Sequence, residues 1–165
     1  MQTITGFRLS PQQKYLWSLV QESPAYRAQC SILIEGNLNQ ETLKAALQTV
    51  INRHEILRTS FHRRPGVKVP IQVIESSTVP FWEVIDFTQI DSDDTQTKLQ
   101  RCFEEEIRTN FKFDKQPLLR LSLVHLSEDR YILLVSLPSL CADNRTLKNL
   151  IQEISQSYQA CLQGE

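Results

Sequence analysis

Residues 53–61 read Arg53-His54-Glu55-Ile56-Leu57-Arg58-Thr59-Ser60-Phe61 and predict a junction between a helix and a strand. The junction gathers three basic side chains and one acidic side chain around three large apolar ones. A guanidinium in a protein interior needs a fixed anionic partner, because an unpaired charge in a low dielectric costs several kcal/mol. Asp143 is the best candidate, since it follows the most apolar strand of the sequence and precedes a long amphipathic helix. We therefore expect Arg58 to pair with Asp143 in the interior.

Hydrophobic periodicity divides the rest of the chain into helices and strands. The expected helices cover residues 10–22, 39–53, 91–107 and 145–162. The expected strands cover residues 30–35, 57–63, 68–74, 81–85, 118–126 and 131–137. The last two strands form a hairpin, and the second of them is apolar on both faces, as in a strand that is covered on both sides. With only 4 glycines and no low-complexity stretch, the sequence shows no domain linker.

Two details of this pattern make specific structural predictions. Pro70 and Pro80 interrupt their strands, which favours edge positions for both strands because proline cannot donate a ladder hydrogen bond. The helix that begins with the acidic residues 91–94 is expected to bury an apolar stripe and to turn the glutamates 104–106 mostly towards water. The stripe consists of Leu99, Cys102, Phe103 and Ile107.

Composition describes an ordinary globular chain. Of the 165 residues, 41% are apolar and 22% are charged, and the net charge is −1. This charge gives no electrostatic reason to expect nucleic acid or an anionic membrane as a partner. The longest apolar run is too short to span a membrane, and no signal segment opens the chain, so we expect a cytoplasmic protein.

The four cysteines, Cys30, Cys102, Cys141 and Cys161, are widely spaced and form no C-x-x-C pair. Neither a zinc site nor a disulfide framework is indicated, and we expect no metal. Cys30, Cys102 and Cys161 lie on apolar faces of their elements and are expected to be buried free thiols.

Three motifs give the sequence a family resemblance. Arg53–Thr59 resembles the Arg-His-Glu-x-Leu-Arg-Thr motif of nonribosomal peptide synthetase condensation domains. Ser10–Trp17 resembles the opening Ser-x-Ala-Gln-x-Arg-Leu-Trp motif of that family, with Gln12 for Ala and Tyr15 for Arg.

The third motif is Phe111–Arg120, which resembles the family segment Phe-Asp-Leu-x-x-Gly-Pro-Leu-Leu-Arg, with Lys112 for Asp and Gln116 for Gly. The motifs keep the family's order and spacing over nearly the whole chain. The resemblance implies one lobe of a chloramphenicol-acetyltransferase-like fold, an α/β sandwich in which helices pack on a mixed sheet. On this basis residues 1–165 form the N-terminal lobe of a condensation-type domain, and the second lobe is absent from this chain.

The departure from the family falls at residues 138–144, Pro138-Ser139-Leu140-Cys141-Ala142-Asp143-Asn144, where the family has His-His-x-x-x-Asp-Gly. In the family the second His is tied to amide formation, and Ser139 stands in its place. An imidazole titrates near about 6.5, whereas a hydroxyl can only donate or accept hydrogen bonds. Ser139 either orients an amine or stabilises an oxyanion, or it lines a tunnel that no longer forms amides. Pro138, Cys141 and Asn144 are expected to line the site.

Other candidate residues have two interpretations each. Cys141 is a potential nucleophile or a side chain packed beneath the loop. His125 is excluded as its base, because a strand of about 30 Å separates the two. His54 either reaches the site or acts as a favourable cation at the end of a helix. The residues Arg63, Arg64 and Lys68 form either a docking surface for an acidic carrier protein or a solvated turn.

The resemblance implies an atypical condensation domain that handles acyl and aminoacyl thioesters on donor and acceptor peptidyl carrier proteins. No cofactor is expected to bind this chain directly, since phosphopantetheine belongs to the carriers. If Met1 is the native start, the donor comes from a separate protein or the domain acts at initiation. The alternative is a catalytically inactive domain that docks a carrier protein or partner enzyme. An acyltransferase acting on coenzyme A thioesters is a third interpretation, which the absent histidine disfavours.

Overall fold

The computed structural model describes residues 6–20, 23, 25–90, 92–115 and 117–164. The predicted helix end at Glu22, the acidic cap at Asp91 and the motif position Gln116 lie outside these residues. The helices are α1 (Pro11–Val20), α2 (Gln40–Arg53), the 3-10 turn η1 (Glu55–Arg58), α3 (Ser92–Arg108) and α4 (Asn144–Gln163). The strands are β1 (Phe7–Arg8), β2 (Arg27–Glu35), β3 (Thr59–His62), β4 (Ile71–Ile74), β5 (Phe81–Asp86), β6 (Arg120–Ser127) and β7 (Arg130–Pro138).

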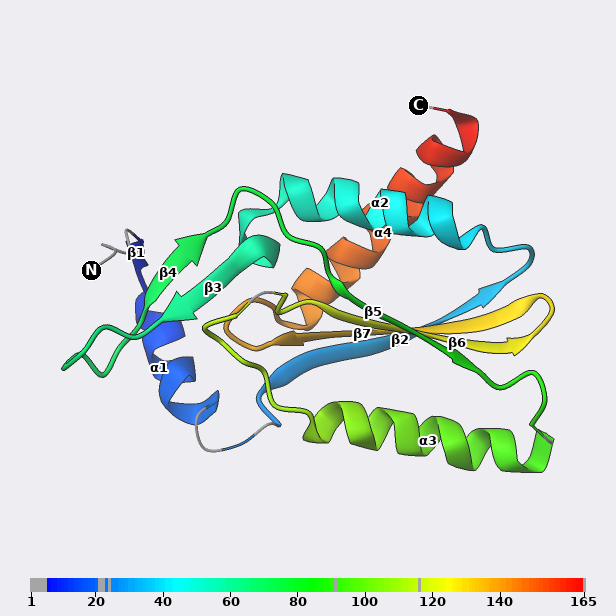
Figure 1. Cartoon of the computed structure of the whole chain (residues 1–165), viewed down its shortest axis with the longest axis horizontal. Helices are drawn as coiled ribbons and strands as arrows, with labels where there is room; N and C mark the ends of the chain where they lie inside the picture. Colours follow the sequence, from blue (N-terminus) through cyan, green and yellow to red (C-terminus); the bar gives the residue numbers. More distant parts are fainter. Residues whose placement is uncertain (1–5, 21–22, 24, 91, 116, 165) are drawn as a thin grey trace.

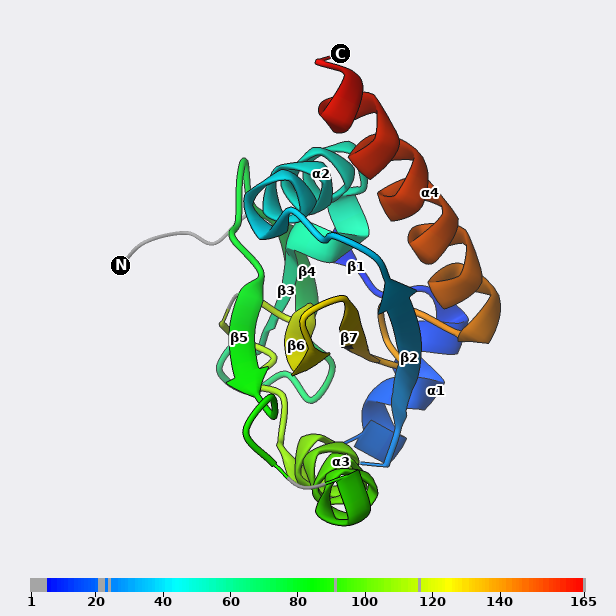
Figure 2. The ribbon, with the colours of Figure 1, turned by 90° about the vertical axis from the view of Figure 1, so that its right-hand side faces the viewer.

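The main sheet has four strands in the order β2-β7-β6-β5. β5 runs parallel to β6 and the other neighbours are antiparallel, so the sheet is mixed, as predicted. β6 and β7 form the predicted hairpin, and β7 lies between β2 and β6 with both faces covered. Helices α2 and α4 lie together on one side of this sheet, and α3 lies on the opposite side (Figures 1 and 2).

The two faces of the main sheet differ in chemistry. Alternate residues of β6 and β7 join the apolar core with α2 and α4, for example Leu121, Val135 and Leu137. The opposite face, which α3 covers, presents Arg120 opposite Ser136. The hydrophobic effect therefore attaches α2 and α4, whereas α3 meets a partly polar surface.

This surface explains where the predicted burial of α3 is wrong. Ile107 is 41% exposed, and the rest of the expected apolar stripe is only half-buried. Glu106, for which the sequence predicts an exposed position, is the buried residue among the described side chains of α3, at 7% exposure. Its burial places a carboxylate on the polar face of the sheet.

A second, three-stranded sheet has the order β1-β4-β3. Pro80 precedes β5, which is an edge strand as predicted, but Pro70 precedes β4, which is the central strand of its sheet. The edge prediction for β4 is wrong because Pro70 lies just outside the strand, where its missing N–H removes no ladder hydrogen bond. The junction at residues 53–61 runs from α2 through η1 into β3.

Several helix ends follow local sequence rules. The Ser10 hydroxyl accepts a hydrogen bond from the Gln13 amide at 3.2 Å, while the Gln13 side chain accepts one from the Ser10 amide at 3.0 Å. This reciprocal pair is a capping box, with Pro11 at the first helical position. Asn39 caps α2 by accepting from the Thr42 amide at 3.0 Å. Within the described part of the chain, no helix is both long and apolar enough to cross a membrane.

The cap at Asn39 gives a direct test of the α2 boundary. Asn39→Ala should lower the free energy of unfolding by about 1 kcal/mol, because the Thr42 amide loses its acceptor. Asn37→Ala, in the exposed loop two residues earlier, is the matched control and should change it by less than about 0.5 kcal/mol. Urea denaturation of both variants measures the difference, and equal effects would contradict the assignment.

Candidate functional site

The loop at residues 138–144, hereafter the motif loop, joins the central strand β7 to α4. The Pro138 carbonyl accepts hydrogen bonds from the amides of Cys141 at 2.8 Å and Ala142 at 3.3 Å, which closes a tight turn. The Leu140 carbonyl accepts from the Gln13 side chain of α1 at 3.3 Å. The loop is therefore held by its own turn and by a contact with α1.

Ser139 lies half-buried in this turn. Its backbone amide donates to the Tyr26 carbonyl at 3.1 Å, which ties the loop to the residue before β2. Its hydroxyl makes no hydrogen bond to any residue that the structure describes. The hydroxyl therefore remains available to donate to or accept from another group.

Asp143 is exposed and caps α4. One carboxylate oxygen accepts from both the amide and the hydroxyl of Thr146, each at 2.7 Å. The Thr146 amide is the main reason why the pKa of Asp143 lies below its usual value, and the Thr146 hydroxyl adds to the effect. Asp143 is therefore an ionised helix cap.

Arg58 finds its partners close to its own position. Its guanidinium donates to the Glu75 carbonyl and lies 3.9 Å from the carboxylate of Glu55, one turn earlier. Its Nε is buried and has no hydrogen-bond partner among the described residues. The predicted ion pair between Arg58 and Asp143 is wrong, because Arg58 lies beside Glu55 and the Glu75 carbonyl, whereas the Asp143 carboxylate caps α4.

The Cys141 thiol is not a nucleophile in this structure. It is 7% exposed, and burial raises its pKa to about 12, so the thiol stays protonated at neutral pH. The packed interpretation of Cys141 is therefore the correct one. The other three cysteines are also free, but they are partly exposed rather than buried.

His54 and His125 contact residues outside the motif loop. His54 ends α2, and its Nε2 lies 2.8 Å from a carboxylate oxygen of Glu153 in α4, which Arg53 also approaches at 3.2 Å. The hydrogen bond from His54 lowers the pKa of Glu153. His125 stacks on Tyr131, its partner across the hairpin, with the ring centres 4.6 Å apart. His54 thus links the end of α2 to α4 through Glu153.

The predicted basic surface is partly engaged within the chain. Arg63, Arg64 and Lys68 are exposed, and the Arg63 guanidinium lies 5.3 Å from the centre of the Trp17 ring. No group of three or more potential metal ligands occurs among the described side chains.

The motif-loop residue Asn144 lines a groove between β2 and α4. The groove has a volume of about 480 Å³ and is lined by Gln29, Cys30, Ser31, Ile32, Asn144, Leu147, Lys148, Ile151 and Gln152. The side-chain amide and hydroxyl groups in this lining can donate and accept hydrogen bonds. The groove is therefore a polar and apolar surface that begins next to the motif loop.

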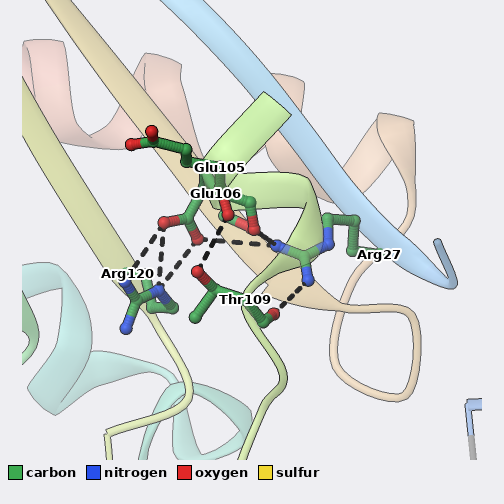
Figure 3. Close-up of polar contacts among 6 residues, drawn as sticks. Arg27, Glu105, Glu106, Thr109 and Arg120 are labelled. Carbon is green, nitrogen blue, oxygen red and sulfur yellow. Dashed lines mark hydrogen bonds and ion pairs between the residues drawn. The ribbon is translucent and has the colours of Figure 1, made fainter. Parts of the chain in front are cut away.

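Sequence reasoning missed a buried ion network on the other face of the sheet (Figure 3). Arg120 of β6 donates to both carboxylate oxygens of Glu106, from Nε at 2.8 Å and from a terminal nitrogen at 3.1 Å. Arg27 of β2 lies 3.5 Å from the same carboxylate. The side chains of Arg27, Glu106 and Arg120 are 3%, 8% and 20% exposed.

Arg27 also reaches the end of α3. Its guanidinium donates to the carbonyl of Glu106 in the last turn of α3 and to that of Thr109, which follows the helix. Burial lowers the pKa of Arg27, Glu106 opposes this shift and Arg120 adds to it. The signal for this network was present in the helical period, because Glu106 follows Leu99 by seven residues and so lies on the same stripe.

The network predicts a large difference between neighbouring glutamates. Glu106→Ala should lower the free energy of unfolding by about 3 kcal/mol, because two buried guanidinium groups lose their anion. Glu105 points away from the network (Figure 3), and Glu105→Ala should stay within about 0.5 kcal/mol of the wild type. Denaturant titration of the two variants gives the comparison. Similar losses would show that Glu106 contributes no more than a surface charge.

The cap at Asp143 predicts a pH dependence. Because its folded pKa is lowered, the ionised cap stabilises the protein above the ordinary aspartate pKa, and this contribution is lost as the pH falls through the folded pKa. The stability difference between the wild type and Asp143→Ala should therefore be largest at neutral pH and shrink in acid. Urea titrations at several pH values measure it. A difference that grows in acid would refute the cap.

The sequence matches a family model and is similar to several known proteins. A family model for condensation domains matches residues 5–165. Cyclosporin synthetase of Tolypocladium inflatum is 32% identical over 156 residues, which cover 93% of this chain and 1% of the relative. Chondramide synthase of Chondromyces crocatus is 30% identical over 155 residues, which cover 92% of this chain and 4% of the relative. The chain thus spans a small part of the length of these relatives.

Solved structures show the same fold. The starter condensation domain of rhizomide synthetase has a TM-score of 0.83 at 22% identity, covering 97% of this chain and 40% of that one. The first condensation domain of the calcium-dependent antibiotic synthetase, in complex with a substrate analogue, has a TM-score of 0.84 at 19% identity. That match covers 98% of this chain and 39% of the other. These likenesses confirm the predicted α/β fold with helices packed on a mixed sheet.

Proposed function

Because this chain belongs to the condensation-domain family, we propose that it forms the N-terminal lobe of an atypical condensation domain of a nonribosomal peptide synthetase. The domain handles acyl and aminoacyl thioesters carried by donor and acceptor carrier proteins and joins them through an amide bond. The observation that carries the proposal is the family match over residues 5–165, which includes the motif loop at the start of α4. The remaining wall of the site comes from a second lobe.

In the proposed reaction the acceptor amine attacks the donor thioester carbonyl. The carbon–nitrogen bond forms and the carbon–sulfur bond breaks. The amine loses one proton, and the sulfur gains one and leaves as a thiol. Ser139 supports this step by hydrogen bonding to the amine or to the developing oxyanion, because its hydroxyl is not engaged within the described chain. The phosphopantetheine arms belong to the carriers, and this chain binds no cofactor of its own.

The motif loop supplies no evident base for this step. The Cys141 thiol stays protonated because burial raises its pKa to about 12, and the Asp143 carboxylate is occupied by Thr146. Catalysis by this loop therefore relies on positioning and on hydrogen bonds rather than on proton abstraction. Orientation alone accounts for a large part of many rate enhancements.

Related structures support an acyl donor. A variant of the starter condensation domain of rhizomide synthetase was solved with C8-CoA, and another with C8-CoA and Leu-SNAC. We extend this chemistry to the present chain as an acyl or aminoacyl thioester donor and an aminoacyl acceptor.

The chemistry of the motif loop also favours a second candidate function. In that alternative the domain forms no bond and serves as a docking platform for a carrier protein or a partner enzyme. The observation behind it is the combination of Ser139 in the motif with a protonated, buried Cys141. The two functions differ in whether loaded carriers are consumed.

Amide formation from loaded carriers by the complete two-lobed domain tests the proposal. We expect turnover in the parent protein, a loss of roughly tenfold or more in kcat for Ser139→Ala if the hydroxyl acts in the transition state, and a gain for Ser139→His. Ser127→Ala is the matched control, because Ser127 lies at the turn of the β6–β7 hairpin, at the opposite end of β7 from the motif loop. It should leave kcat unchanged. No turnover in the parent, with carrier binding retained, would reject amide formation in favour of docking.

A further inference from the structure

We propose that Arg27 is a positioning residue for the motif loop. The proposal rests on the proposed function only in taking this loop as the reacting part of the domain. It is carried by two sets of contacts that meet at Arg27, one through its backbone and one through its side chain.

The backbone of Arg27 borders the motif loop directly. Arg27 begins β2 and lies opposite Pro138, the first residue of the loop, in the antiparallel register. The Tyr26 carbonyl, one residue earlier, accepts the Ser139 amide at 3.1 Å. The position of Ser139 is therefore tied to the position of the first residues of β2.

The end of a strand has little to hold it, because terminal hydrogen bonds open at low free-energy cost. Described contacts at the start of β2 include the Arg27 amide, which donates to the Ala25 carbonyl at 2.8 Å, and the Tyr26 carbonyl, which accepts the Ser139 amide. The Arg27 side chain adds an ion pair and hydrogen bonds to backbone carbonyls to these contacts. It is 3% exposed and so has a fixed environment.

The side chain of Arg27 contacts the chain on several sides. It donates to the carbonyls of Glu106 and Thr109 at the end of α3 and lies 3.5 Å from the Glu106 carboxylate. Its guanidinium lies 4.8 Å from the centre of the Phe111 ring and 3.4 Å from the Ser136 hydroxyl of β7. A planar guanidinium with partners in several directions has one orientation, so the Arg27 backbone is fixed with it.

Arg120 provides a matched control within the same network. It binds the Glu106 carboxylate as Arg27 does, but it lies at the start of β6, opposite Phe81 and Ser136, and does not border the motif loop. Removing Arg120 therefore removes a charge from Glu106 without releasing the start of β2. A purely structural role for the network predicts equal effects of the two arginines on the loop.

Amide hydrogen exchange of the full chain tests this inference without any need for turnover. In Arg27→Met, exchange at the amides of Ser139, Cys141 and Ala142 should rise by roughly tenfold or more relative to the amide of Leu133 in the middle of β7. Arg120→Met should raise all four amides by the same factor. Arg27→Lys keeps the charge but loses the planar fork, and should give an intermediate, loop-specific increase.

Each outcome decides the inference. A loop-specific increase in the Arg27 variants but not in Arg120→Met supports it. An equal increase across the loop and Leu133 overturns it, and so does an equal loop-specific increase in Arg27→Met and Arg120→Met. If Arg27→Met does not fold, Arg27→Lys is judged by the same comparison.

In the two-lobed domain, Arg27→Lys should lower kcat with little change in KM. Arg120→Lys should leave both kcat and KM nearly unchanged. A parent domain without turnover would reject the proposed amide formation, while the exchange result would still decide the role of Arg27.

Discussion

The Glu106 carboxylate lies on one face of the main sheet, where it pairs with the guanidinium groups of Arg27 and Arg120. The expected apolar stripe of α3 is half-buried or exposed, and Glu106 is the buried residue among its described side chains, paired with Arg27 and Arg120. A buried charge is costly alone and tolerated when it is paired and hydrogen-bonded. The network therefore fixes which way α3 faces and also holds Arg27, which begins the strand beside the motif loop.

Local rules in the sequence predicted much of the fold. The helix that starts at about Ser10, the helix that starts at about Asn39 and the apolar strand β7 depend on neighbouring residues or on simple periodicity, and the structure contains all three. The position of the motif loop between a buried strand and a helix was predictable for the same reason. Such features require no knowledge of how distant segments meet.

Pairing between distant charges was not predictable in the same way. Arg58 and Asp143 each need a partner, which suggests that they meet, yet Asp143 binds Thr146 and Arg58 lies beside Glu55 in its own turn. The charged neighbours of Glu106 favour a surface position for it, although the helical period places it on the buried stripe. Which charge is buried depends on the opposing surface, and a single helix does not reveal that surface.

The topology of the main sheet also constrains how the polypeptide acquires its shape during synthesis. β2 is translated before β7, yet the two strands pair along their length, and Cys30 lies opposite Val135. Contacts between segments so far apart form slowly, since a long loop must close first. An unpaired strand waiting for its neighbour is prone to aggregation. In the nascent chain, β2 therefore lacks its neighbour in the sheet until the hairpin of β6 and β7 has been translated.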